Sequence, residues 1–249
     1  MNRNESFAAP QVNALNVRLA WASLEMIVDD VPEIQVVVSG DEHDVTDLKI
    51  SCSDGKLLLE QPTYGLTMKL NTERWMQLFV RVPKSWKGAA SISTISGAVN
   101  VRGLTGTDLS LETVSGDLRT MGMSCMNLNL KTATGDIHAM NITCDGLNLR
   151  SVSGQVKVQN VSARQVKTMN VSGETTLEFV EPFEKVDGNT VSGNIRLYAP
   201  MTEADATLSS LNGRVRTSGV FLKENAPVIR INSISGDLEI HENSKVEEE

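Results

Sequence analysis

The chain has 249 residues and a mass of 27.1 kDa, which suits one large domain or two small ones. Hydrophobic residues make up 40% and charged residues 22%, a composition that excludes intrinsic disorder and a collagen-like chain. The 23 basic and 31 acidic residues give a net charge of -8. This charge repels polyphosphate and argues against nucleic acid as a partner.

The first ninety residues contain four stretches in which apolar and polar residues alternate, the pattern of half-buried strands. They are residues 16–20, 34–39, 57–60 and 77–82, and Pro83 follows the last of them. We expect residues 1–90 to form less regular coils or a small β-sheet. This part would cap the N-terminal end of the region that follows, because an uncovered sheet edge is a template for strand addition.

A short unit of the type Thr-Val-Ser-Gly recurs eight times between residues 91 and 240. Its glycines are Gly97, Gly116, Gly135, Gly154, Gly173, Gly193, Gly213 and Gly236, at intervals of 19, 19, 19, 19, 20, 20 and 23 residues. Apolar and polar residues alternate on both sides of each glycine. This pattern predicts two short strands joined by a turn in which glycine can adopt a positive φ.

Units of this size cannot bury an apolar face alone, so successive units are expected to stack as parallel rungs. We predict an all-β fold, a single-stranded β-solenoid of 19–20-residue coils with an N-terminal β cap. A rung spacing of ~4.8 Å gives a rod on the order of 40 Å long. Residues at one offset from the glycines then form columns. Residues 179–187 and 219–227 break the period and are expected to project as loops that carry specificity.

The polar segment 241–249 ends in three glutamates and is predicted to be an acidic tail. No basic segment followed by an apolar run occurs in the first thirty residues, and no apolar stretch approaches the ~20 residues of a membrane helix. As written, the chain is therefore expected to be cytoplasmic, with no membrane span.

The repeats resemble those of the bacterial putative-adhesin family of domains of unknown function, whose members carry tandem T-V-S-G-D-L units. The match is best at residues 113–118 and 233–238, and residues 78–84 are similar to the strand and proline that precede the repeats in that family. The resemblance covers residues 78–240 well and the N-terminal part loosely. It implies a β-solenoid, often tied to the cell envelope or its stress responses, with no established catalytic residues. The cell envelope or surface is therefore the alternative location.

The third residue after each glycine forms a predicted column that is largely basic. Its basic members are Arg119, His138, Lys157, Arg196 and Arg216, and Asn100, Thr176 and Glu239 interrupt them. Such a stripe could follow an anionic polymer, for instance an envelope glycopolymer, or a lipid-headgroup surface. The alternative is a solvated strand face whose charges are neutralised by a neighbouring acidic column, Asp117, Asp136, Glu174 and Asp237.

Three cysteines are too few for a disulfide framework. Cys125 and Cys144 each lie ten residues before a repeat glycine, so the solenoid stacks them on neighbouring rungs. Their separation would be near the ~5 Å that a disulfide tolerates. Reduced thiols are favoured, and a bridge is the alternative in an exported protein. Neither the cysteines nor the histidines show metal-ligand spacing, so no metal or cofactor is predicted.

No catalytic residues are predicted, since the repeated serines and aspartates beside the glycines are typical of turns. We therefore expect a non-enzymatic binding or scaffold module whose partner is an envelope polymer or a protein. A carbohydrate-active enzyme is one alternative, because stacked Asp117 and Asp136 would meet the ~5–9.5 Å separation of glycosidase carboxylates. It would require Asp117, Asp136 and His138 to line a groove. A scaffold that self-assembles through its ends is the other alternative, and the sequence leaves the oligomeric state open.

Overall fold

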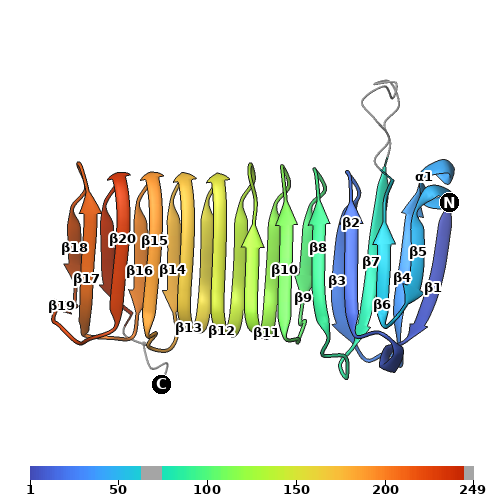
Figure 1. Ribbon diagram of the computed structural model, residues 1–249, viewed down its shortest axis with the longest axis horizontal. Coiled ribbons are helices and arrows are strands. Elements are labelled where there is room, and N and C mark those ends of the chain that lie inside the picture. Colours follow the sequence, from blue (N-terminus) through green and yellow to red (C-terminus); the bar gives the residue numbers. More distant parts are fainter. Residues whose placement is uncertain (63–74, 244–249) are drawn as a thin grey trace, which may run out of the picture.

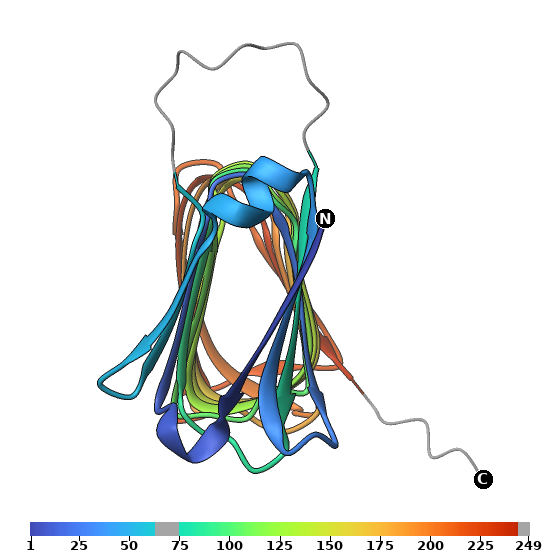
Figure 2. The same cartoon turned by 90° about the vertical axis from the view of Figure 1, so that its right-hand side faces the viewer.

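The computed structural model describes residues 1–62 and 75–243. The strands line up in a row along the long axis of the molecule (Figure 1), and an end-on view shows that they form two faces joined at their edges (Figure 2). Each repeat supplies one strand to each face, and the strands of repeats that are neighbours in the stack pair in parallel. The prediction of an all-β solenoid is confirmed.

Face A is the sheet whose strands precede the turn glycines, and face B is the sheet whose strands follow them. From the C-terminal to the N-terminal end, face A contains β17 (Glu203–Ser210), β20 (Val228–Ser235), β15 (Lys185–Ser192), the second halves of β13 (Val156–Ser172), β12 (Ile137–Ser153) and β11 (Leu118–Lys131), then β10 (Asp108–Thr113), β8 (Ala89–Thr94), β2 (Ala14–Leu19), β6 (Lys56–Glu60) and β5 (Lys49–Ser53). In the same direction, face B contains β18 (Val215–Ser218), β21 (Leu238–Glu242), β16 (Ile195–Ala199), β14 (Thr175–Phe179), the first halves of β13, β12 and β11, then β9 (Val99–Arg102), β3 (Ser23–Asp29), β7 (Met76–Pro83), β4 (Glu33–Gly40) and β1 (Asn2–Ala8). Outside the two faces lie β19 (Phe221–Leu222), the helix α1 (Glu42–Asp47) and a 3₁₀ turn, η1 (Ala9–Gln11).

The repeat glycines line one edge of the rod, where each chain segment passes from face A to face B. The backbone N–H of Gly116 donates to the Thr113 hydroxyl at 2.9 Å, which closes the turn. A Cβ atom on Gly116 would lie 2.2 Å from the carbonyl oxygen of Gly97 on the next rung, and one on Gly154, whose φ is +139°, 2.1 Å from that of Gly135. The rungs therefore stack at their close spacing only because this column has no side chains.

A second bend lies in face B, where β11, β12 and β13 turn back toward face A without interruption. Its residues have positive φ angles that recur once per rung, 74° at Gly103, 71° at Gly122, 56° at Asn141 and 54° at Asn160. Only glycine and, less often, asparagine adopt this conformation readily. The Nδ2 of Asn160 donates to the Oδ1 of Asn141 at 3.0 Å, so these side chains also connect neighbouring rungs.

The core is one continuous layer between the faces, filled by the inward residue of each alternating strand. Leu111, Leu130 and Leu149 form one of its columns, and each is fully buried. Phe179 and Phe183 are also buried, with ring centroids 4.6 Å apart. The expectation that residues 179–187 project as a loop is therefore wrong, because β14 runs to Phe179, β15 begins at Lys185 and the connection packs its aromatic rings inward.

The rungs follow chain order except near the two ends of the rod. β15 pairs with β20, and β20 pairs on its other side with β17, so the rung of Gly236 lies between those of Gly193 and Gly213. The expectation that successive units always stack on each other is wrong for these last units. At the other end, the rung formed by β2 and β3 lies between β8/β9 and β6/β7. Near each end of the rod, one rung is thus inserted between two rungs that are consecutive in the sequence.

The N-terminal end changes from parallel to antiparallel pairing. β4 pairs antiparallel with β7, β1 pairs antiparallel with β4, and β5 pairs antiparallel with β6. At the C-terminal end of the chain, β21 runs through Glu242, and the ring of His241 stacks on that of Tyr198 at 4.8 Å. Residues 241 and 242 of the predicted acidic tail therefore belong to β21, and residues 244–249 lie outside the described part of the chain.

Candidate functional site

The predicted basic column is present as a row of register partners on the outer side of face B. Arg119 pairs with His138, and His138 pairs with Lys157. Thr176 follows Lys157 and separates it from Arg196. Thr176 therefore divides the stripe into two parts. In the second part, Arg196 and Arg216 lie on opposite sides of Glu239.

Carboxylates neutralise the part of the stripe near the C-terminal end. Arg196 forms ion pairs with Glu174 and Glu239, the latter at 2.8 Å from Nε to Oε2. Arg216 lies 2.7 Å from Asp237 and 3.2 Å from Glu239. The hydrogen bond from Arg196 lowers the pKa of the Glu239 carboxyl, although its partial burial opposes this shift. These two arginines therefore bind carboxylates of the chain itself.

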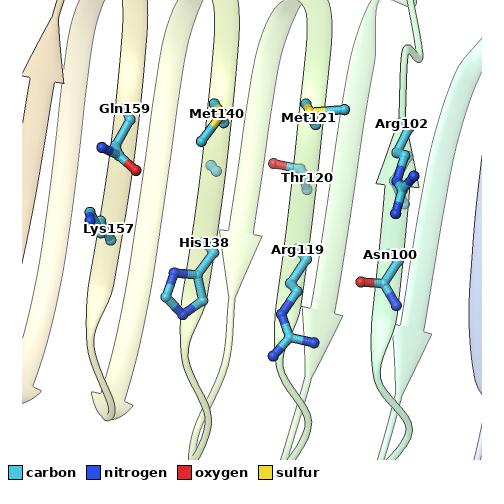
Figure 3. Close-up of a pocket in the computed structure, with 11 residues that line it drawn as sticks. Asn100, Arg102, Arg119, Thr120, Met121, His138, Met140, Lys157 and Gln159 are labelled. Carbon is cyan, nitrogen blue, oxygen red and sulfur yellow. The ribbon is translucent and has the colours of Figure 1, made fainter.

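The other part of the stripe lines a shallow groove of about 370 Å³ on face B. Figure 3 shows two rows of side chains in it, with Asn100, Arg119, His138 and Lys157 in one row and Arg102, Met121, Met140 and Gln159 in the other. Val101, Thr120 and Ala139 complete the lining. Among the described residues that line the groove, four can carry positive charge and none is acidic.

The cations of the groove differ in how far they are neutralised. Arg119 Nη2 lies 2.9 Å from Asp117, and His138 Nε2 lies 3.9 Å from Asp136. Within the described residues, no carboxylate lies within 4.0 Å of Lys157 or Arg102. The groove thus has an uncompensated positive charge in a protein that is acidic as a whole.

Two methionines give the same groove an apolar side. Met121 and Met140 are register partners and are 44% and 39% exposed, whereas most methionines in a sheet face inward. Methionine is flexible and polarisable, so it adapts to apolar ligands of irregular shape. The site therefore combines cations with an exposed thioether surface.

Asp117 and Asp136 lie at the turn edge and are not part of the groove lining. The carboxylate of Asp117 accepts the backbone N–H of Asp136 at 3.1 Å, and that of Asp136 accepts the N–H of Gln155 at 2.8 Å. Each aspartate thus bridges to the next rung. The carbohydrate-active alternative requires Asp117, Asp136 and His138 to line one groove. Of these three residues only His138 lines the groove on face B, so the required arrangement is not formed.

Cys125 and Cys144 are register partners at the ends of the face B segments of β11 and β12. Both are free thiols, as is the exposed Cys52. Burial and the nearby Asp108 raise the pKa of Cys125 to about 11, and burial, Cys125 and Asp145 raise the pKa of Cys144 to about 12. At neutral pH this pair therefore stays protonated and unreactive.

Sequence reasoning missed Arg102 and the two methionines, although a signal for them was present. They lie five residues after Gly97, Gly116 and Gly135, so the same register that defined the basic stripe also defines their column. In the described part of the chain, no three His, Cys, Asp or Glu side chains gather to hold a metal ion. None of its helices is long and apolar enough to cross a membrane.

A family model, Toastrack DUF4097, matches residues 12–241. The chain belongs to the Toastrack family. Two solved structures with the same fold are putative adhesins, one from Bacteroides fragilis (TM-score 0.64, 14% identity, 97% of each chain covered) and one from Parabacteroides distasonis (TM-score 0.62, 13% identity, 96% of this chain and 97% of the other). A putative lipid binding protein from Parabacteroides distasonis is also similar (TM-score 0.54, 16% identity, 96% of each chain covered). No curated protein matches the chain.

The Toastrack match agrees with the family resemblance of the repeats, and these structural neighbours are two putative adhesins and a putative lipid binding protein. At 13% to 16% identity, the likeness to the solved structures shows the fold. Any function therefore depends on the side chains that line the groove of this chain.

Proposed function

We propose that this Toastrack protein is a non-enzymatic binding module whose face B groove binds an anionic amphiphile, a molecule with an acidic headgroup and an apolar part. The observation that carries the proposal is the groove lining, in which Arg102, Arg119, His138 and Lys157 lie beside Met121 and Met140 without a carboxylate. A volume of about 370 Å³ falls within the ~300–1,000 Å³ typical of small-ligand pockets.

The charge of the groove explains selectivity for anions, and the methionines explain why an amphiphile fits better than a purely polar polymer. A headgroup phosphate or carboxylate would pair with Lys157 or with Arg102, which lie three rungs apart and have no partner carboxylate within the described residues. An acyl segment would cover the exposed thioethers. The likeness to a putative lipid binding protein supports the same ligand class. We place this activity at the cell envelope, where the resemblance to adhesins points.

Titration calorimetry with a soluble short-chain lipid tests the proposal. We expect dihexanoylphosphatidylglycerol to bind and dihexanoylphosphatidylcholine to bind much more weakly. Lys157→Glu should weaken binding of the anionic lipid by about tenfold or more, since a cation near an anionic lipid contributes ~1 kcal/mol and its reversal counts twice. The matched control is Lys167→Glu, an equal charge change on the outer side of face A, which should leave the affinity unchanged.

A methionine variant separates an amphiphile from an anionic polymer. We expect Met121→Ser with Met140→Ser to weaken lipid binding while leaving any binding of dextran sulfate unchanged. Equal affinity for both lipids, or loss of binding with Lys167→Glu as large as with Lys157→Glu, would reject the groove as the site. If dextran sulfate binds tightly and the two methionine substitutions do not change lipid binding, the ligand is an anionic polymer and not an amphiphile.

A further inference from the structure

The C-terminal end of the rod is formed by β17 on face A and β18 on face B, and it leaves both strands with an unpaired edge (Figure 1). β17 pairs outward only at Glu203 and Ala204, with the two-residue strand β19. Within the described ranges, 1–62 and 75–243, no segment pairs with the outer edge of residues 205–210 or of β18. The rod therefore ends in two rows of backbone donors and acceptors.

The core is also incompletely covered at this end. Ala206, Leu208 and Val215 face inward but remain partly exposed, whereas their register partners Ile229, Ile231 and Leu238 on the next rung are buried. The most exposed large apolar side chains of the described residues are here as well, Leu211 at 80% and Phe221 at 75%. An apolar cross-section rimmed by unpaired strands is a surface that associates with another surface.

Among the described residues, the N-terminal end also has unpaired strand edges, those of β1 and β5, and Phe7 and Ile50 on these strands are only partly buried against the core. Its two faces, however, end unevenly. Beyond the rung of β2 and β3, face A continues with two strands, β6 and β5, and face B continues with three, β7, β4 and β1. The helix α1 lies along one edge of this end (Figure 2). Val45 of α1 and Leu48 after it are buried, with exposures of 0% and 1%. At the C-terminal end, by contrast, β17 and β18 end the two faces on the same rung. A head-to-tail contact with the uneven N-terminal end therefore cannot pair both faces at once.

We propose that the C-terminal end is a homodimer interface in which a second copy of this chain packs end to end. The occupant is a second copy because two copies match strand for strand. A two-fold axis perpendicular to the faces sets β17 against β17 and β18 against β18, each pair antiparallel and equal in length. Four edges are satisfied at once, and a two-fold contact of this kind joins only two chains.

The pleat of the strands restricts how the copies pair, because core-facing residues must lie opposite core-facing residues. Leu208 can lie opposite Leu208 of the second copy, with Ala206 opposite Ser210. Thr217 opposite Thr217 sets Arg216 opposite Ser218, so that two arginines do not meet. The two cores then become continuous through Leu208 and Val215.

This arrangement keeps face B of both copies on one side of a rod of double length. Two face B grooves would then face the same surface and bind it with an avidity that neither has alone. The dimer itself goes beyond the proposed ligand binding and does not depend on it. Lys157→Glu should therefore weaken lipid binding and leave the dimer intact, which separates the two proposals.

Sedimentation equilibrium over a wide concentration range tests the interface. The expected species at high concentration has twice the mass of the 27.1 kDa chain. Leu211→Asp with Phe221→Asp should give a folded monomer, since both side chains are largely exposed in a single chain. The matched control Val114→Asp changes a 52% exposed apolar residue of an inner rung and should stay dimeric.

A backbone variant tests the strand pairing separately. The N–H of Asp205 points inward to Pro227, so the N–H of Ala206 points to the open edge. Ala206→Pro should remove that donor, be tolerated at an edge position and abolish the dimer. A wild-type mass of 27.1 kDa at every concentration, growth beyond a dimer, or a dimer that survives both sets of substitutions would overturn the proposal.

Discussion

Asp117 serves two structural interactions with its two carboxylate oxygens. Oδ1 accepts the backbone N–H of Asp136 on the next rung at 3.1 Å, and Oδ2 lies 2.9 Å from the guanidinium of Arg119. The first contact supports the turn edge, whereas the second competes with any anionic ligand for Arg119. Replacing the carboxylate by an amide separates these effects because an amide oxygen still accepts the hydrogen bond.

We predict that Asp117→Asn strengthens binding of dihexanoylphosphatidylglycerol by up to about fivefold, since an exposed ion pair is worth ~0.2–1 kcal/mol. The thermal midpoint should change little because the contact between the rungs remains. Titration calorimetry measures the affinity, and Asp237→Asn, which releases Arg216 outside the groove, is the control. A weaker affinity in Asp117→Asn, or an equal gain in the control, would contradict the role assigned to Arg119.

At the scale of elements, the pairing of β11 with β12 brings Cys125 and Cys144 together at a half-buried position. Their raised pKa values, about 11 and about 12, lie above the ~8.5 of an unfolded thiol. Folding therefore favours the protonated thiols. Their contribution to stability is present below pH 8.5 and is lost as the pH rises toward 11 and 12, because the unfolded chain loses these protons first.

We predict that iodoacetamide at pH 8 modifies the exposed Cys52 rapidly and the paired thiols slowly, as measured by mass spectrometry. The free energy of unfolding should fall between about pH 9 and pH 11 more steeply in the wild type than in Cys125→Ser with Cys144→Ala. Equal labelling of all three thiols at pH 8, or identical pH profiles of the two proteins, would show that burial does not protect this pair.

Periodicity in the sequence predicted the elements of the repeat region well, because its cause is local. Each unit of the repeat contains a glycine, which marks the turn because it must lie close to the backbone of the next rung. Apolar and polar residues alternate on both sides of this glycine, which identifies the strands of both faces. The sequence therefore predicted that Arg119, His138 and Lys157 lie in one column on the solenoid. The ion pairs that neutralise Arg196 and Arg216 could not be predicted in this way. They depend on side-chain rotamers and on the order of the rungs, which brings both arginines next to Glu239.

The order of the rungs could not be predicted from patterns within one repeat. The units ending in Gly213 and Gly236 carry similar turns and similar alternation, so nothing within either unit says which one packs against the unit of Gly193. The longer interval of 23 residues was the only sign of a difference. The structure shows that this extra length, which includes β19, lets the chain pass the outer rung and insert β20 and β21 beneath it.

At the scale of the whole molecule, every column and both proposed surfaces depend on the order in which the rungs stack. The insertion of the last rung buries the chain's final strands and makes β17 and β18 the open end. Stacking in chain order would instead put β20 and β21 at the end and pair Asn189 with Ser209. The two orders therefore predict different neighbours for Asn189, which is register partner of Asn232 in the structure.

Disulfide trapping distinguishes these orders directly, in a chain whose three native cysteines are replaced by serine or alanine. Asn189→Cys with Asn232→Cys should cross-link under mild oxidation, since adjacent strands lie ~4.8 Å apart and a disulfide spans Cα atoms 4.4–6.8 Å apart. Asn189→Cys with Ser209→Cys, two rungs apart, should remain reduced. A bridge in the second pair and none in the first would contradict the account.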